Sequence, residues 1–198
     1  MRLILIRHGE TRGNVDHLLD TAYPGLPLNR RGQRQAKALP QILAGQPIDL
    51  IFSSDINRAQ QTAAPLARDR GLETRLHPGL REIQAGDWEM DEDWQPYQDV
   101  IAAWATDPTR RIPGAETGLE FMARFDGAVA DLLATGADCV AAVSHGAAMR
   151  AWTTFQARNL PMPEARLWRV VNTGRIILDQ TDQGWRVVDW SEFFSAAD

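Results

Sequence analysis

An arginine and a histidine stand together directly after the first apolar run of the chain. The run Leu3–Ile6 is typical of a short buried strand, and Arg7, His8 and Gly9 follow it. Glycine can adopt backbone angles that bring main-chain N–H groups close to an anion, and a guanidinium matches the oxygens of a phosphate. This combination predicts a phosphate site at the end of the strand.

Further apolar runs end in polar side chains of related chemistry. These runs are Leu50–Phe52, the segment around Glu73–His77, and Cys139–Val143. Because parallel strands bring their carboxyl ends to one edge of a sheet, the side chains that follow the runs are expected to converge there. The converging side chains are Arg7 and His8, Arg58, Glu82 and His145.

The same regions contain motifs that match a known family, in the family's order along residues 3 to 146. The motifs are Arg7–Thr11 with Asn14 after it, Leu28–Ala36, Ser53–Ala63, Leu80–Glu89 and Ser144–Gly146. On these motifs the chain resembles the histidine phosphatase superfamily, also called the phosphoglycerate mutase-like family. Two positions depart from the family pattern. Met90 stands where glycine is commoner, and Asn29 where threonine or serine is commoner.

Helical and strand segments alternate along the chain, which predicts a mostly parallel sheet covered on both faces. Asn29 and Asp55 are the expected N-caps of the first two long helices. Helices are expected over residues 29–44, 55–69 and 116–135 and after His145, and late strands at Leu167–Val171, Arg175–Asp179 and Trp185–Trp190. With the resemblance, residues 1–198 are expected to form one α/β domain, a three-layer αβα sandwich of phosphoglycerate mutase-like fold.

The stretch from about residue 88 to residue 118 interrupts this alternation. It contains an acidic patch, the aromatic residues Trp94, Tyr97 and Trp104, and a turn-rich end. The resemblance implies that the stretch is a small lid insertion that covers the active site and helps to choose the substrate. The alternative is that the aromatic residues pack a small helix onto the core.

Phosphoryl transfer requires cationic donors held in place, a neutral nucleophile and an acid for the leaving group. His8 is the expected nucleophile, because neighbouring arginines favour a neutral imidazole. Glu82 is the expected acid; if it only pairs with Arg81 at the surface, Glu89 or Glu10 takes its place. The expected phosphate-binding residues are Arg7, Asn14, Arg58 and His145, with His145 counted as catalytic as well.

Composition excludes several other classes of protein. A net charge of −5 disfavours nucleic acids and anionic membranes as partners. The four histidines show no ligand spacing, so neither a metal nor another cofactor is expected. The single cysteine, Cys139, is expected in the core. No apolar run has the length of a membrane span or signal-peptide core, which favours a cytoplasmic protein; the oligomeric state stays open, with a homodimer as one option.

The function favoured by these observations is hydrolysis of a small phosphomonoester through a phosphohistidine. One alternative is a phosphoglycerate mutase, an isomerase in which Arg110 and Arg111 would hold a substrate carboxylate. A second alternative is an inactive phosphate-binding module. The acidic, aromatic stretch favours a small ester with an apolar leaving group, and the sequence does not identify the substrate. His17, His77 and Asn172 are not assigned to the site.

Overall fold

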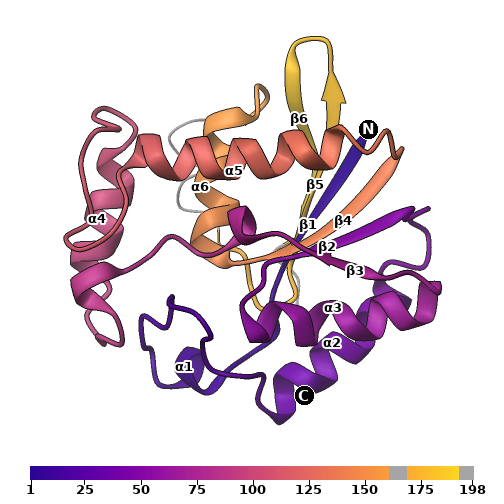
Figure 1. The fold of residues 1–198 in the computed structure, drawn as a ribbon, viewed down its shortest axis with the longest axis horizontal. Coiled ribbons are helices and arrows are strands. Elements are labelled where there is room, and N and C mark those ends of the chain that lie inside the picture. Colours follow the sequence, from indigo (N-terminus) through magenta and orange to yellow (C-terminus); the bar gives the residue numbers. More distant parts are fainter. Residues whose placement is uncertain (161–168, 192–198) are drawn as a thin grey trace.

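A mixed sheet forms the centre of the protein (Figure 1). The computed structural model describes residues 1–160 and 169–191, and in these residues the sheet has six strands. They are β1 (Arg2–Arg7), β2 (Leu50–Ser53), β3 (Thr74–Leu76), β4 (Cys139–Ser144), β5 (Arg175–Thr181) and β6 (Gly184–Ser191). The sheet order is β3-β2-β4-β1-β5-β6; the first four strands run parallel, and β5 pairs antiparallel with both of its neighbours, β1 and β6.

Helices cover both faces of this sheet. Figure 1 shows α2 (Arg30–Ile42) and α3 (Asn57–Arg70) on one face, and α5 (Gly118–Leu133) and α6 (Gly146–Gln156) on the other. The remaining helical segments are α1 (Arg12–Val15), α4 (Gln95–Ala103) and the 3-10 turns η1 (Pro78–Leu80) and η2 (Gly86–Trp88). The three layers confirm the expected α/β sandwich. None of the helices in the described residues is long and apolar enough to cross a membrane.

The uninterrupted apolar run of β1 follows from its central position. Leu3 and Leu5 belong to a core cluster shared with α5 and α6, whereas Ile4 and Ile6 belong to the cluster shared with α2 and α3. Successive side chains of a strand point to opposite faces, so a strand covered on both faces is apolar at every position. β1 is thereby fixed from both sides, and its carboxyl end has a fixed place in the fold.

The two expected helix caps have different outcomes. Asn29 caps α2 as predicted, with its side-chain oxygen accepting from Gly32 N at 2.8 Å. The cap at Asp55 was wrong: the N-cap of α3 is Ile56 and makes no side-chain cap hydrogen bond. The Asp55 carboxylate instead accepts two hydrogen bonds from Arg81, from Nε to Oδ1 at 2.6 Å and from Nη2 to Oδ2 at 2.5 Å. A bidentate ion pair is stronger than a single cap hydrogen bond, which explains why Asp55 pairs with Arg81 instead of capping α3.

The late strands also differ in part from expectation. β5 and β6 are present close to their predicted positions. Residues 167 and 168 of the other expected strand lie outside the described residues, and residues 169–171 form no strand.

Two aromatic residues of the 88–118 stretch pack as core residues. Tyr97 and Trp104 are buried, and Trp104 stacks on Phe121 with the ring centroids 5.7 Å apart. Their polar atoms are paired, since Tyr97 Oη donates to Ile83 O at 2.8 Å and Trp104 Nε1 donates to Arg110 O at 2.7 Å. The packing matches the alternative in which these side chains fasten a small helix, α4, to the core. The role of the stretch as a lid stays a prediction.

Candidate active site

A cavity of about 640 Å³ opens where the parallel strands end. Its lining comes from segments that are far apart in the sequence, as expected for the carboxyl edge of a parallel sheet. The predicted residues among the lining are Arg7, His8, Asn14, Arg58 and Glu82. His145 is fully buried beside them, with its ring centroid 5.2 Å from that of His8. The predicted site residues therefore lie together.

His8 has a defined tautomer. Its Nδ1 lies 2.7 Å from Gly9 O, and because a carbonyl oxygen only accepts, the proton of the neutral ring is on Nδ1. The Nε2 atom then carries the lone pair. Burial lowers the pKa of His8 well below its ordinary value, and the positive charges of Arg58 and Arg7 lower it further. His8 is thus a neutral imidazole with an unprotonated Nε2.

Gly9 has a different role from the one that its conformational freedom suggested. Its N–H donates to Thr62 Oγ1 at 2.9 Å, so this group is not free for an anion. A Cβ at Gly9 would lie 2.7 Å from Gly32 O, which means that the backbone of the His8 loop packs directly on the first turn of α2. Gly9 is needed for close packing rather than for anion binding.

Two arginines line the cavity, and both are held by hydrogen bonds. Arg7 donates from Nη1 to Val170 O at 2.7 Å, and Arg58 donates from both terminal nitrogens to Asp20. The Nε atoms of both guanidiniums are buried and have no partner among the described residues. Burial lowers the pKa of Arg7 to about 10, so it remains charged. Buried donors without partners are rare in folded proteins, and here they mark positions for the oxygens of an anion.

Both ring nitrogens of His145 are engaged. Arg58 Nη2 lies 3.3 Å from Nδ1 and can only donate, so Nδ1 is the acceptor. The ring proton is therefore on Nε2, which donates to Ser54 Oγ at 2.9 Å. Burial lowers the pKa of His145 well below its ordinary value, and Arg58 and His8 add to this effect. Ser54 was not singled out in the sequence, although it stands in the Ser53–Ala63 motif.

Glu82 is held at the start of α6. Its carboxylate accepts from Ala148 N at 2.7 Å, Ile83 N at 2.9 Å and Ala147 N at 3.1 Å. The N-terminus of a helix stabilises a negative charge, so this position suits a carboxylate. Glu82 makes no ion pair with Arg81, which binds Asp55 instead. The reading of Glu82 as a surface partner of Arg81 does not hold.

The substitute acids have other partners. Glu89 accepts from the backbone N–H groups of Thr21 and Ala22 and from the Thr21 hydroxyl, and Glu10 accepts from Asn29 Nδ2 at 2.8 Å. Neither residue lines the cavity.

Arg110 and Arg111 also lie outside the cavity lining. Arg111 donates to Ala115 O at 2.6 Å and to Glu120 Oε1 at 2.9 Å. A role for this pair in holding a substrate carboxylate is therefore not supported by their position.

Several lining residues were not predicted from the sequence. Asn172 donates from Nδ2 to His8 O at 3.1 Å and to Asn14 Oδ1 at 2.9 Å, which joins the turn before β5 to the His8 loop. The Asn-Thr-Gly turn was the available signal, and Thr173 in it has a positive φ of 58°. Other lining residues outside the predicted site include His17, Asp20 and Arg150 and, from the 88–118 stretch, Glu92, Trp94, Tyr97 and Gln98.

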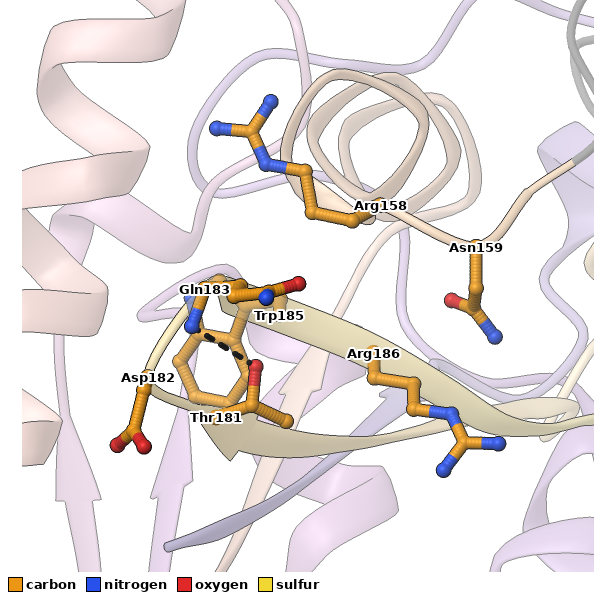
Figure 2. A pocket seen from close by; sticks show the side chains of 7 residues that line it. All are labelled: Arg158, Asn159, Thr181, Asp182, Gln183, Trp185 and Arg186. Carbon is orange, nitrogen blue, oxygen red and sulfur yellow. Dashed lines mark hydrogen bonds between the residues drawn. The ribbon is translucent and has the colours of Figure 1, made fainter.

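A second cavity of about 390 Å³ lies beside the β5–β6 hairpin. Figure 2 shows its two arginines, Arg158 and Arg186, with their guanidinium groups directed away from each other. Its lining contains no histidine, and the Asn159 side chain is already paired with the backbone of Val187. This cavity lacks the groups for phosphoryl transfer.

Comparisons with known proteins identify the class of protein that has this fold. The chain matches the model of the histidine phosphatase superfamily (branch 1) over residues 3–192. It belongs to this superfamily and is an enzyme.

Several named relatives of the chain are phosphatases. It is 33% identical to the adenosylcobalamin/alpha-ribazole phosphatase of Salmonella typhimurium, over 98% of this chain and 93% of that protein. It is 32% identical to the glucosyl-3-phosphoglycerate phosphatase of Mycobacterium tuberculosis, over 93% of this chain and 86% of that protein. A solved mycobacterial glucosyl-3-phosphoglycerate phosphatase in complex with VO3 superposes with a TM-score of 0.81 at 30% identity, covering 96% of this chain and 98% of that chain.

The buried neutral state of His8 predicts a pH dependence of stability. The folded-state pKa lies below the ordinary value of 6.5, so below that pH the unfolded chain binds the proton more readily and the folded state loses stability. We expect His8→Asn to flatten the dependence of the unfolding free energy on pH between about pH 6.5 and 5 by up to about 1.4 kcal/mol per pH unit. Urea denaturation of both proteins across this range measures the slope. The slopes should coincide above about pH 7.5, and equal slopes at acid pH would contradict the prediction.

Proposed function

We propose that the protein hydrolyses phosphomonoesters of small phosphorylated metabolites through a phosphohistidine at His8. The observation that carries this proposal is the pair of buried Nε donors of Arg7 and Arg58, which have no partner in residues 1–160 and 169–191, beside an imidazole whose proton is on Nδ1. The two guanidiniums supply charge and donors for the transferring group, and Nε2 of His8 supplies the lone pair.

In the first step His8 Nε2 attacks phosphorus in line with the ester oxygen. The N–P bond forms, the P–O bond breaks, and its electron pair leaves with the alcohol oxygen. Glu82 acts as the general acid and gives a proton to that oxygen. In the second step Glu82 takes a proton from water, the water oxygen attacks phosphorus, and the N–P bond breaks. Phosphate leaves and His8 is neutral again.

The remaining residues are proposed to orient this reaction. Asn14 is joined through Asn172 to the carbonyl of His8, so the amide pair is positioned beside the nucleophile. His145 is held between Ser54 and Arg58 behind the His8 ring. His145 thereby orients Arg58, one of the two arginines proposed to bind the phosphate.

Hydrolysis is favoured over the mutase reaction by the relatives and by the site. The relatives named above are phosphatases, acting on alpha-ribazole and glucosyl-3-phosphoglycerate esters according to their names. Arg110 and Arg111, the residues that would have supported the mutase, do not line the cavity. The inactive module is disfavoured because His8, both cavity arginines and Glu82 are all present. A cytoplasmic location and a homodimer stay predictions.

The nucleophile is tested by His8→Ala. This change removes the attacking nitrogen, so we expect turnover of a phosphomonoester to fall by more than about 10³-fold with the fold retained. Quenching the wild-type reaction under alkaline conditions should trap a phosphoryl group on His8, detected by mass spectrometry. His77→Ala is the matched control, since His77 pairs with Asp131 away from the cavity. Wild-type turnover in His8→Ala would refute the mechanism.

The acid is tested by Glu82→Gln. Gln keeps an acceptor for the backbone donors at the start of α6 but cannot give a proton, so alkyl phosphates should react about 10²–10⁴-fold more slowly. Aryl phosphates, whose leaving groups need little protonation, should be affected far less. Glu89→Gln serves as the control. An equal loss on alkyl and aryl esters would assign Glu82 a structural role.

The choice of acceptor is tested by comparing two reactions in one sample. With a phosphoglycerate as substrate and no added bisphosphoglycerate or divalent metal, we expect release of inorganic phosphate that survives a chelator. Water is the expected acceptor because the relatives named above are phosphatases and because Arg110 and Arg111, the pair that would hold a phosphoglycerate carboxylate, do not line the cavity. Isomerisation that outruns phosphate release by about tenfold, a barrier difference of roughly 1.4 kcal/mol, would instead establish a mutase.

A further inference from the structure

The loop after α1 brings a carboxylate into the cavity beside Arg58. Asp20 and Arg58 are 38 residues apart in sequence, and their side chains are 8% and 2% exposed. Arg58 Nη1 lies 3.2 Å from Asp20 Oδ2, and Arg58 Nη2 donates to the backbone oxygen of the same residue at 2.9 Å. Asp20 thus accepts hydrogen bonds from both terminal nitrogens of the guanidinium.

These two hydrogen bonds to Asp20 determine which donors of Arg58 remain for a ligand. A guanidinium is planar, so fixing both terminal nitrogens fixes the direction of the Nε–H bond as well. That Nε is the buried donor without a partner among the described residues. The second hydrogen of Nη2 is donated to His145 Nδ1, so the orientation that Asp20 gives to Arg58 also sets the tautomer of His145.

We propose that Asp20 is a positioning residue of the phosphate site: it aims Arg58 Nε at the phosphate and offsets part of the charge of Arg58. The proposal rests on the proposed function and adds a residue that no sequence motif indicated. In the free enzyme the carboxylate compensates a guanidinium that is removed from water. With phosphate bound, the same carboxylate repels the dianion, so Asp20 weakens phosphate binding while it orients the donor.

The contacts of Asp20 allow orientation and charge to be separated. Oδ2 accepts both from Arg58 Nη1 and from Leu26 N, the latter at 3.1 Å, whereas Oδ1 accepts only a longer bond from Leu26 N at 3.4 Å. An asparagine can therefore place its oxygen at the Oδ2 position and keep both contacts. Asp20→Asn removes the charge and keeps the orientation; Asp20→Ala removes both, except for the backbone contact.

The experiment measures binding of inorganic phosphate by calorimetry, thermal stability with and without phosphate, and steady-state hydrolysis. Asp20→Asn should bind phosphate at least about threefold tighter than wild type, because the repulsion is gone. Its Tm should be lower without phosphate and rise more when phosphate is added, because the ligand replaces the lost charge. Its kcat/KM should stay within about tenfold of wild type, and Asp20→Ala should lose about 10–100-fold, mainly in kcat.

Asp16→Asn is the matched control. Asp16 is paired with Arg12 on the surface and does not line the cavity, so this change should move none of these quantities. Unchanged or weaker phosphate binding by Asp20→Asn would overturn the inference, as would wild-type kcat/KM in Asp20→Ala. If Asp20→Ala does not fold, Asp20→Asn alone decides. A wild-type protein that binds phosphate without hydrolysing any ester would contradict the proposed function, and the binding comparison would still test Asp20.

Discussion

The site depends on the burial of positive charge next to a histidine. Arg7 and Arg58 are brought out of water at the end of the central strands, and removing a charge from water is unfavourable unless partners compensate it. The protein supplies these partners only in part: a carbonyl for Arg7, and Asp20 and His145 for Arg58. Burial lowers the pKa of His8, and the positive charges of Arg58 and Arg7 lower it further, so the same arrangement keeps His8 neutral.

The fixed position of these charges comes from the two cores. Because β1 is buried on both faces, neither Arg7 nor His8 can shift without disturbing two packed clusters. Arg58 is fixed in another way, since it sits in the first turn of α3 and is closed over by the loop at Gly25. A Cβ at Gly25 would lie 2.4 Å from Arg58 Nη1, and this glycine has a φ of +70°. Rigid strands and a close-fitting loop thus hold the donors before any ligand arrives.

The sequence predicted the parts of the site that follow strands and failed where contacts are distant. Arg7 and His8 stand at the end of β1 and His145 directly after β4, whereas Arg58 and Glu82 follow β2 and β3 by a few residues. Short apolar runs in the sequence show where these strands end. No local sequence pattern identifies Asp20, because its role depends on contact with Arg58, which is 38 residues away in the sequence. The cap at Asp55 failed for the same reason: Arg81, 26 residues away, competes for the carboxylate. Local patterns give helices and strands, whereas a side chain's partner is chosen by the finished fold.

The position of Glu82 at the start of α6 affects how strongly the cavity can bind free phosphate. The start of a helix is a common resting place for anions, because its first N–H groups have no other partner. In α6 that place is already taken by a carboxylate of the chain itself. An incoming phosphate cannot settle there and meets only side chains around it. The Glu82 carboxylate thus occupies N–H groups that could otherwise bind phosphate, which limits the affinity of the cavity for free phosphate.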